Sequence, residues 1–321
     1  MLRILFVGTG TFAQPALEGL LDSHHEIVGL VTQPDRSGAG KHQHAHPLKE
    51  LASARGLEVF QPVNVNSDDS LTRLKEFNAD LFVVAAYGQI LKAPFLAIPR
   101  LGAINIHASL LPRHRGAAPI NYAILAGDAE SGISIFQIEP KLDAGPVWGM
   151  VATPIGPKEA AVQLENRLSD LGSGLLLKVV DQIDQGTATP LVQDPSLVTR
   201  APKMPKAFGL IDWSRDAAFI ERQVRALQPW PTAYSFLHVE GQAPHRIVLV
   251  DVDAVAAPRN ASTAGVVITH PDGPLVVRTG DGAVAIRKLQ PAGKRVMAVE
   301  EFLRGRSVPS GARFGAESSE Q

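Results

Sequence analysis

Short apolar runs alternate with amphipathic stretches through the first half of the chain, and this alternation constrains the fold more than any other feature. The apolar runs are β-rich, are bounded by glycine, proline or asparagine, and span residues 4–7, 27–32, 81–86 and 104–106. Helical patterns lie between and after them at residues 12–21, 47–55, 70–77 and 117–126. Continuous apolar runs of this length suit strands that are buried on both faces. We therefore predict an α/β fold with a doubly wound, mostly parallel, Rossmann-like sheet.

The next segments complete this first domain, which we place at residues 1–189. Two β-rich runs at 133–138 and 147–151 face each other across a Pro-containing turn and predict a hairpin. A long helical pattern over 160–185 follows and ends at a glycine. Residues 190–208 then contain four prolines and the basic side chains Arg200, Lys203 and Lys206. Proline at this density cannot continue a helix, so we predict a stiff, basic connector.

A second, smaller domain is predicted over residues 209–307. A helical pattern covers 213–227, and five short β-rich runs follow at 233–239, 246–252, 265–269, 274–279 and 283–289. Five short strands at such spacing are typical of an OB-like β-barrel. The Gly/Ser-rich residues 308–321 are expected to form a disordered tail.

Bulk composition excludes several classes of protein. The 321 residues carry a formal net charge of −1, so a nucleic-acid ligand would need a local concentration of basic residues. The chain has no cysteine, which excludes disulfides, thiolate metal sites and a cysteine nucleophile. The first apolar run is too short for a signal peptide or a membrane span. We expect a cytoplasmic monomer that makes no contact with membranes.

A glycine-rich motif at residues 8–13 offers one functional hypothesis. Gly8-Thr9-Gly10-Thr11-Phe12-Ala13 follows a predicted strand and opens a helix, and Asp35 lies where a ribose-binding acid belongs. This pattern is typical of a nicotinamide-dinucleotide site and would indicate an oxidoreductase. A lone match of this kind is weak, so a tight strand-to-helix turn is the favoured interpretation and the dinucleotide site is kept as the rival hypothesis.

Stronger chemistry is indicated where a predicted strand ends. Asn105 and His107 are two positions apart, so both side chains lie on one face of that strand. Ligands of open α/β sheets gather at the carboxyl ends of strands. No acidic residue occurs between Arg100 and Asp128, so we expect a positive crevice mouth. Asp143 follows in a Gly/Pro turn that can project toward the same strand ends.

These three residue types favour direct transfer of a group between two bound substrates. Cysteine is absent and Ser109 has no obvious base, so an acyl-enzyme is not expected. Asn105 and His107 can donate hydrogen bonds to a developing oxyanion, while Asp143 would orient the imidazole and help a proton pass through water. Taken singly, each residue also fits an ordinary structural role as a cap, a hydrogen-bonded histidine or a turn residue.

The pattern Asn105-x-His107-x-Ser109-Leu110-Leu111-Pro112, followed by Asp143, resembles the catalytic pattern of the folate-dependent formyltransferase family, and the chain resembles its methionyl-tRNA formyltransferases. The likeness runs nearly end to end. Other matching stretches lie at residues 31–36, 85–88, 113–120, 127–132, 211–214, 229–231 and 289–294.

This resemblance implies transfer of a formyl group from 10-formyltetrahydrofolate to the α-amine of methionine on initiator tRNA, with Asn105, His107 and Asp143 as catalytic residues. It also implies that a strand-loop, a Ser-Leu-Leu-Pro stretch and the Asp143 turn contact the folate. These folate-binding candidates are Ala85, Ala86, Tyr87, Gly88, Gln89, Ile90, Leu91, Ser109, Leu110, Leu111, Pro112 and Leu142.

Transfer RNA requires basic contacts, and the chain offers them in a loop, in the connector and on the second domain. The candidates are Arg36, Lys41, Arg200, Lys203, Lys206, Lys288, Lys294 and Arg295. For the second domain, a solvated surface is the competing interpretation. No metal is expected, because His42, His44 and His46 alternate in a loop without supporting ligands. Another folate-dependent formyltransferase or hydrolase and a non-enzymatic RNA-binding protein remain as alternatives.

Overall fold

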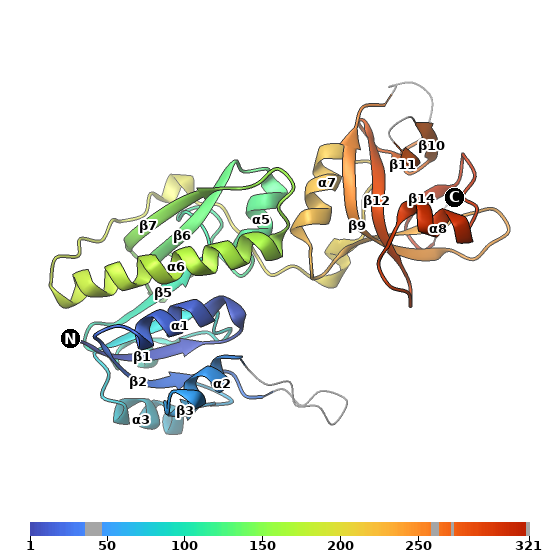
Figure 1. Cartoon of the computed structure of the whole chain (residues 1–321). Helices are drawn as coiled ribbons and strands as arrows, with labels where there is room; N and C mark the ends of the chain where they lie inside the picture. The colour runs from blue at the N-terminus through green and yellow to red at the C-terminus, as the bar shows by residue number, and fades with distance from the viewer. Residues whose placement is uncertain (36–46, 258–262, 271–272, 319–321) are drawn as a thin grey trace. The chain divides into compact units, whose positions relative to one another are not determined.

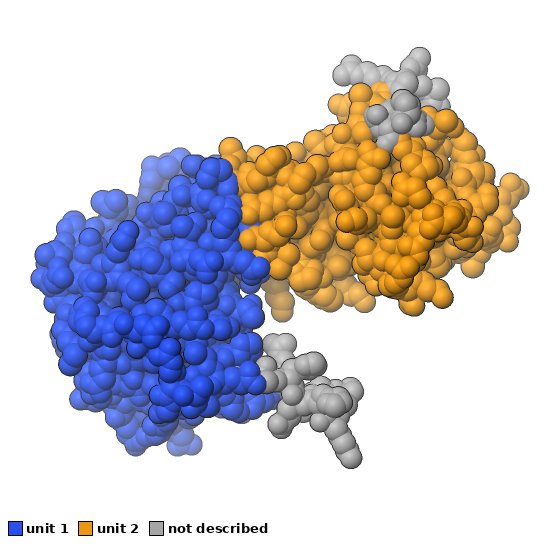
Figure 2. All heavy atoms as spheres, in the orientation of Figure 1, with its two compact units in different colours: residues 1–119, 130–154, 164–202 blue, residues 120–129, 155–163, 203–321 orange. Residues whose placement is uncertain are grey.

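The computed structural model describes residues 1–35, 47–257, 263–270 and 273–318, and its internal contacts divide the chain into two compact units (Figures 1 and 2). Unit 1 comprises residues 1–119, 130–154 and 164–202. Unit 2 comprises residues 120–129, 155–163 and 203–321. The segment predicted as a connector is therefore divided, because its residues up to 202 belong to unit 1.

The sheet of unit 1 has the strand order β3-β2-β1-β4-β5-β6-β7. Its parallel strands are β1 (Arg3–Gly8), β2 (Glu26–Val31), β3 (Val59–Phe60), β4 (Leu81–Ala85) and β5 (Ala103–His107). β6 (Glu130–Gln137) and β7 (Val147–Pro154) follow as an antiparallel pair, with β6 antiparallel to β5. The predictions of a mostly parallel sheet and of a hairpin are thus confirmed.

Helices connect and cover these strands. They are η1 (Thr11–Ala13), α1 (Gln14–Leu21), α2 (Pro47–Ala54), α3 (Asp68–Glu76), α4 (Ala93–Leu96) and α6 (Ala161–Asp184). α5 (Pro119–Ala126) connects β5 to β6 in the chain and belongs to unit 2 from residue 120 on. The long helix α6 is tied to the first crossover, since Ser169 Oγ donates to Phe12 O and Ser173 Oγ donates to Pro15 O, both at 2.7 Å. Within the described ranges, no helix combines the length and apolar character needed to cross a bilayer.

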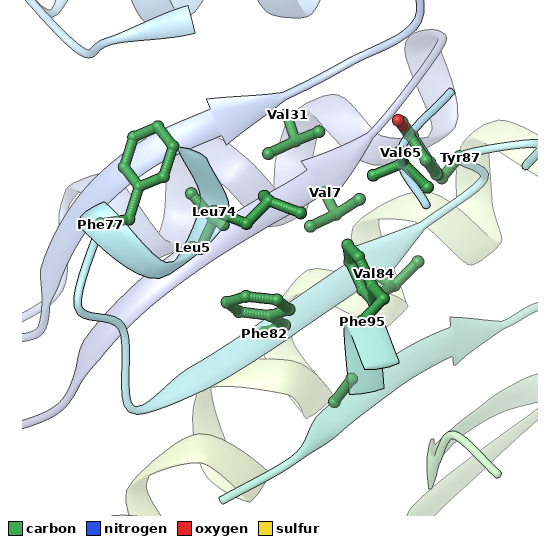
Figure 3. Close-up of a cluster of buried hydrophobic side chains, with 11 residues drawn as sticks. Leu5, Val7, Val31, Val65, Leu74, Phe77, Phe82, Val84, Tyr87 and Phe95 are labelled. Atoms are coloured by element: carbon green, nitrogen blue, oxygen red, sulfur yellow. The ribbon is translucent and has the colours of Figure 1, made fainter. Parts of the chain in front are cut away.

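The core between the sheet and α3 holds the strand ends in register. Side chains of β1, β2 and β4 point toward α3 and α4 in one cluster (Figure 3). Phe82 and Phe95 are fully buried within it, with ring centroids 5.1 Å apart. Truncating such an aromatic side chain to alanine typically costs about 3–5 kcal/mol. This packing explains why β4 and the adjacent β5 present their carboxyl ends at fixed positions.

Unit 2 is built on an antiparallel sheet whose strand order is β10-β11-β12-β9-β8-β14, with β13 on β12. The strands are β8 (Ala233–His238), β9 (His245–Val255), β10 (Val267–His270), β11 (Gly273–Arg278), β12 (Ala283–Pro291), β13 (Met297–Ala298) and β14 (Arg313–Gly315). Helical segments in this part of the chain are η2 (Pro195–Leu197, in unit 1), η3 (Lys206–Gly209), α7 (Ala217–Ala226) and α8 (Val299–Gly305).

Closure of this sheet into a barrel, as the sequence predicts, is not established by strand ladders among the described residues. The two terminal strands of the path are linked by a single bridge between Val266 and Arg313 and by neighbouring hydrogen bonds, such as Phe314 N to Gly265 O at 2.7 Å. The antiparallel character is confirmed.

Part of the predicted disordered tail is ordered. Residues 313–315 form β14 and pair with β8. The physical reason is burial, because Phe314 is only 3% exposed and stacks near Trp213, with ring centroids 5.7 Å apart. A single aromatic residue in a Gly/Ser-rich stretch was too weak a signal for a strand.

Candidate active site

The carboxyl end of β5 carries the first two predicted catalytic residues. Asn105 lies between Val84 of β4 and Phe136 of β6, and His107 lies opposite Ser134. The alternation of side chains along a strand puts Asn105 and His107 on one face. The Asn105 side chain is half-buried, and no hydrogen bond to it is found within the described parts of the chain. Its amide is thus available to a ligand.

His107 is held in one orientation by its surroundings. Its Nε2 lies 3.0 Å from His114 O, and because a carbonyl can only accept, Nε2 carries a proton. The ring packs edge-on against Phe136 with centroids 6.1 Å apart. Nδ1 is then the nitrogen that faces Asp143, with Oδ2 at 3.9 Å.

Burial lowers the pKa of His107 below its ordinary value of 6.5, and the negative charge of Asp143 opposes this shift. The hydrogen bond to His114 O also favours the charged form, while the neighbouring His114 disfavours it. The neutral imidazole is therefore the resting form near neutral pH, with a lone pair on Nδ1. This nitrogen can accept a proton, and the resulting imidazolium would be stabilised by Asp143.

Asp143 is fixed by a second loop. Its backbone has φ = 47°, a left-handed conformation that an L-residue adopts only when surroundings impose it. Its Oδ2 accepts a hydrogen bond from Gly116 N at 2.7 Å. A side chain at position 116 would meet Ala201 O at 2.4 Å, so only glycine allows the backbone here to lie this close to Ala201. The loop after β5 and the turn before β7 are thereby joined at the carboxylate.

The structure thus brings His107 and Asp143 together and places Asn105 two residues before His107 on the same face. An amide donor and a neutral imidazole on one face of β5 thus lie with a carboxylate from the turn between β6 and β7, all within unit 1. Such a group can stabilise a developing oxyanion and relay a proton.

The predicted folate-binding strand-loop lies at the end of the adjacent strand β4. Ala85 ends β4 and is buried, whereas Gly88 is exposed and Ile90 is 82% exposed. Tyr87 is buried, its hydroxyl has no hydrogen-bond partner among the residues that the structure describes, and burial raises its pKa to about 12. Gln89 Oε1 accepts from Val65 N at 2.9 Å and ties the loop to its neighbour. The remaining members are Ala86, with φ = 48°, and Leu91, which packs on the core.

The Ser-Leu-Leu-Pro stretch is largely structural in its hydrogen bonding. Ser109 is 1% exposed, and its hydroxyl donates to Arg113 O at 2.6 Å. Ser134 Oγ donates to Ser109 O and accepts from Leu111 N. Leu110 and Pro112 are half-buried, and Leu142, beside Asp143, is 59% exposed. The Ser109 hydroxyl is therefore already engaged within the chain, and a contact between Ser109 and the folate would involve its backbone rather than this hydroxyl.

Several residues that support the site were not identified from the sequence. Thr199 Oγ1 accepts from His114 N at 2.8 Å, and the side chain of Gln193 contacts both Arg115 and the Asp143 turn. Thr199 and Gln193 both lie in the segment predicted as a connector, in which the prolines and basic residues gave no indication of pairing with unit 1. That segment in fact bonds to unit 1, because Leu191 and Val147 exchange two backbone hydrogen bonds of 2.8 Å.

Those predicted tRNA-binding residues that the structure describes are exposed. Arg36 and Lys41 lie outside the described residues. Among the described candidates, Arg200 belongs to unit 1 and the others belong to unit 2. Arg295 forms an ion pair with Glu301, whereas no ion pair involves the other described candidates. These exposed candidates are Arg200, Lys203, Lys206, Lys288 and Lys294.

One cluster in the described ranges has the residue types of a metal site. His24, His25 and Asp181 place their ligand atoms within 4.8 Å of one another. His25 Nδ1 accepts from Leu2 N at 3.2 Å, so the neutral ring carries its proton on Nε2, which donates to Asp181 Oδ1 at 3.0 Å. The nitrogen that would bind a metal is thus already protonated and paired, which favours a structural hydrogen bond.

The glycine-rich motif at residues 8–13 forms a strand-to-helix turn between β1 and α1. Asp35, the acid that a dinucleotide site would need, is bound by Lys49 Nζ at 2.5 Å and by Gln61 Nε2 at 3.0 Å. Its carboxylate is therefore engaged within the chain.

Comparisons with known proteins agree with this architecture. The family model for the formyl transferases matches residues 2–180, and the model for the formyl transferase C-terminal domain matches residues 203–307. Among solved structures, WlaRD, a sugar 3N-formyl transferase, has 16% identity and a TM-score of 0.65, covering 92% of this chain and 99% of that one. An N-formyltransferase from Helicobacter canadensis has 17% identity and a TM-score of 0.64, covering 89% of this chain and 99% of that one.

HypX from Aquifex aeolicus in complex with tetrahydrofolic acid is also similar, with 18% identity and a TM-score of 0.59. The match covers 94% of this chain and 47% of HypX, so the chain spans about half the length of that protein. At these identities the structural likeness establishes a shared fold.

Proposed function

The chain belongs to the formyl transferase family, and from that premise we propose that it transfers a formyl group from 10-formyltetrahydrofolate to the α-amine of methionine on initiator tRNA. The observation that carries this proposal is the convergence of His107 and Asp143 beside Asn105 at the end of β5, inside the region that matches the family. Ile90, in the loop after β4, and Leu142, next to Asp143, are exposed apolar side chains that would suit the flat rings of a folate.

Each catalytic residue has a role that its geometry supports. The attacking amine adds to the formyl carbon, and the Asn105 amide donates to the oxyanion that forms. Nδ1 of His107 accepts the proton that the amine loses, directly or through one water. The imidazolium is stabilised by Asp143, which is already held by Gly116 N. The proton is then delivered to the aniline nitrogen of the donor as its bond to the formyl carbon breaks.

This sequence of steps balances without any further reactant. One C–N bond forms and one breaks, and the proton released by the amine ends on the leaving nitrogen. The products are formylmethionyl-tRNA and tetrahydrofolate. The α-amine of an aminoacyl ester is less basic than that of a free amino acid, so a neutral imidazole is a sufficient base.

The choice of acceptor rests on the sequence resemblance to the methionyl-tRNA formyltransferases and on the basic residues of unit 2. Lys288 and Lys294 are exposed and without ion-pair partners among the residues described, which leaves their charges available to phosphates. The OB-like character predicted for this unit would also suit a nucleic-acid ligand.

A sugar amine is the second candidate acceptor. The observation that favours it is the match with WlaRD, a sugar 3N-formyl transferase, over 92% of this chain and 99% of that one. Both candidates use the same donor and the same chemistry, and they differ only in the amine.

A competition between acceptors tests the proposal. Purified protein is incubated with 10-formyltetrahydrofolate and either methionyl initiator tRNA or a dTDP-linked 3-amino sugar, and both tetrahydrofolate release and formylated product are measured. Product from the tRNA, with elongator methionyl-tRNA as the control, supports the proposal. Product from the sugar alone would mean that the acceptor is a sugar amine and not tRNA. The absence of any folate turnover by folded protein would refute formyl transfer.

A further inference from the structure

The side chain of Gln193 forms four hydrogen bonds within unit 1, although it lies 50 residues after Asp143 in the chain. Its Nε2 donates to Asp143 O at 2.9 Å and to Gly145 O at 2.7 Å. Its Oε1 accepts from Arg115 Nε at 3.1 Å and from Arg115 Nη2 at 2.7 Å. The residue is 9% exposed, so these bonds are shielded from water. We name these four residues the Gln193 network.

The amide of Gln193 can occupy only one orientation. Its two donor protons face two carbonyl oxygens, which can only accept, and its oxygen faces a guanidinium, which can only donate. If the amide were flipped, its oxygen would face the two carbonyl oxygens and its NH₂ group would face the guanidinium of Arg115. All the donors and acceptors of this side chain are satisfied, so the network is rigid.

Both carbonyl contacts fall on the turn that carries the catalytic carboxylate. Asp143 has φ = 47°, a conformation that an L-residue does not adopt without support. Gly145 lies so close to Gln137 that an added side chain would meet its carbonyl at 1.8 Å. Gln193 binds the carbonyls of Asp143 and Gly145 on either side of Ala144, and so holds the turn in the conformation that directs the carboxylate to Gly116 N.

The other end of the network holds a buried cation. Arg115 is 7% exposed, and burial lowers its pKa, while Asp143 opposes the shift and Arg200 adds to it. Its side-chain hydrogen bonds among the described residues go to the neutral oxygen of Gln193. The guanidinium is thus held by a neutral hydrogen-bond partner, while the negative charge of Asp143 favours its protonated form. The backbone of Arg115 is also paired with the same segment, since Ala201 N donates to Arg115 O at 2.8 Å.

We infer that Gln193 is a positioning residue for formyl transfer, which fixes the Asp143 turn and Arg115 relative to each other and so keeps the carboxylate directed at His107. The inference rests on the proposed function, in which Asp143 stabilises the His107 imidazolium. It predicts that Gln193 acts on turnover, because a misplacement of about 1 Å at a catalytic group can reduce rate by about 10²-fold.

The test compares Gln193→Met, which keeps the length of the side chain, with Gln193→Glu, which keeps the acceptors for Arg115 but removes both donors to the turn. Both variants are expected to lower kcat by about 10- to 100-fold and to leave KM for 10-formyltetrahydrofolate within about twofold. Wild-type activity in Gln193→Glu would mean that the residue serves only to pair Arg115, and would overturn the inference. The matched control is Asp194→Asn, which alters the next, exposed residue and is expected to retain wild-type kcat.

A second measurement does not depend on catalysis. Hydrogen exchange of the Gly116 amide reports its bond to Asp143 Oδ2, and the Phe82 amide, bonded to Gly102 O in the core, reports global unfolding. Gln193→Met is expected to accelerate exchange at Gly116 by about tenfold relative to Phe82. Equal acceleration at both amides, or faster exchange at Gly116 with unchanged kcat, would overturn the positioning role. If the wild-type protein transfers no formyl group, the proposed function fails. The exchange measurement is independent of that result, because unchanged exchange at Gly116 in Gln193→Met would refute the role of the network in holding the turn.

Discussion

The strand-end site of unit 1 and the basic side chains proposed to contact tRNA are built in opposite ways. His107 is buried, Asp143 is half-buried, and the two are fixed by bonds to His114 O and Gly116 N. Lys288 and Lys294 are exposed, and no ion pair holds them among the described residues. The first region tolerates little change because each polar group depends on another. The second can change its side chains at little cost in stability.

In the proposed function, the residues that handle the formyl group are tied to the backbone of unit 1, whereas the side chains proposed to meet the acceptor are exposed. A change of acceptor would then require fewer changes in the buried part of the fold than a change of chemistry.

The largest expected effect tests whether the buried site acts as a unit. His107→Ala and Asp143→Ala are each expected to lower kcat by about 10²- to 10⁴-fold, because each removes part of the proton relay. In the double variant the loss should be far smaller than the product of the single losses. Steady-state kinetics on the four proteins of the cycle measures this. Multiplicative losses would mean that the two residues act independently and that the 3.9 Å approach has no catalytic role.

The next effect concerns the amide at the same strand end. Asn105→Ala is expected to lower kcat by about 10²- to 10³-fold, as loss of an oxyanion donor usually does. Its KM for the folate should change little, because the interaction forms in the transition state. Thermal unfolding of the variant serves as the control for folding. Wild-type turnover by a folded Asn105→Ala protein would remove this residue from the mechanism.

A smaller effect is expected in the exposed region. Replacing Lys288 and Lys294 by alanine should raise KM for tRNA while kcat stays near wild type, since these side chains would bind only phosphates. The slope of log affinity against log salt should fall by about 0.7 to 0.9 for each phosphate that is no longer neutralised. Lys75→Ala, an exposed lysine on α3, is the matched control. An unchanged salt slope in the double variant would favour a solvated surface without tRNA.

The smallest effect is a dependence of stability on pH. Because burial lowers the pKa of His107 in the folded chain, the unfolded chain binds more protons as pH falls below 6.5. The free energy of unfolding should therefore decrease through that range, by at most about 1.4 kcal/mol per pH unit from this residue. Chemical denaturation of wild type and His107→Gln between about pH 5 and 8 isolates the effect, since other groups titrate equally in both. A difference between the two that does not vary with pH would contradict the burial of a neutral imidazole.

The sequence by itself determined the parts of the fold that follow from a pattern of apolar and polar residues with a short period. Alternating apolar runs and amphipathic stretches predicted the mostly parallel sheet, and a spacing of two placed Asn105 and His107 on one face of β5. The Gly/Pro turn predicted that Asp143 would project from the sheet. These features are local, because strand and turn preferences depend on neighbouring residues.

Only the tertiary structure decided which polar groups meet across long separations. Gln193 and Thr199 lie in a segment whose prolines predicted a stiff connector, yet their side chains hold the Asp143 turn and the loop of His114. Phe314 likewise pairs a predicted tail with β8. Hydrogen bonds between residues 50 to 85 positions apart leave no periodic trace in the sequence, because their energy depends on burial and geometry that arise only when the sheet has formed.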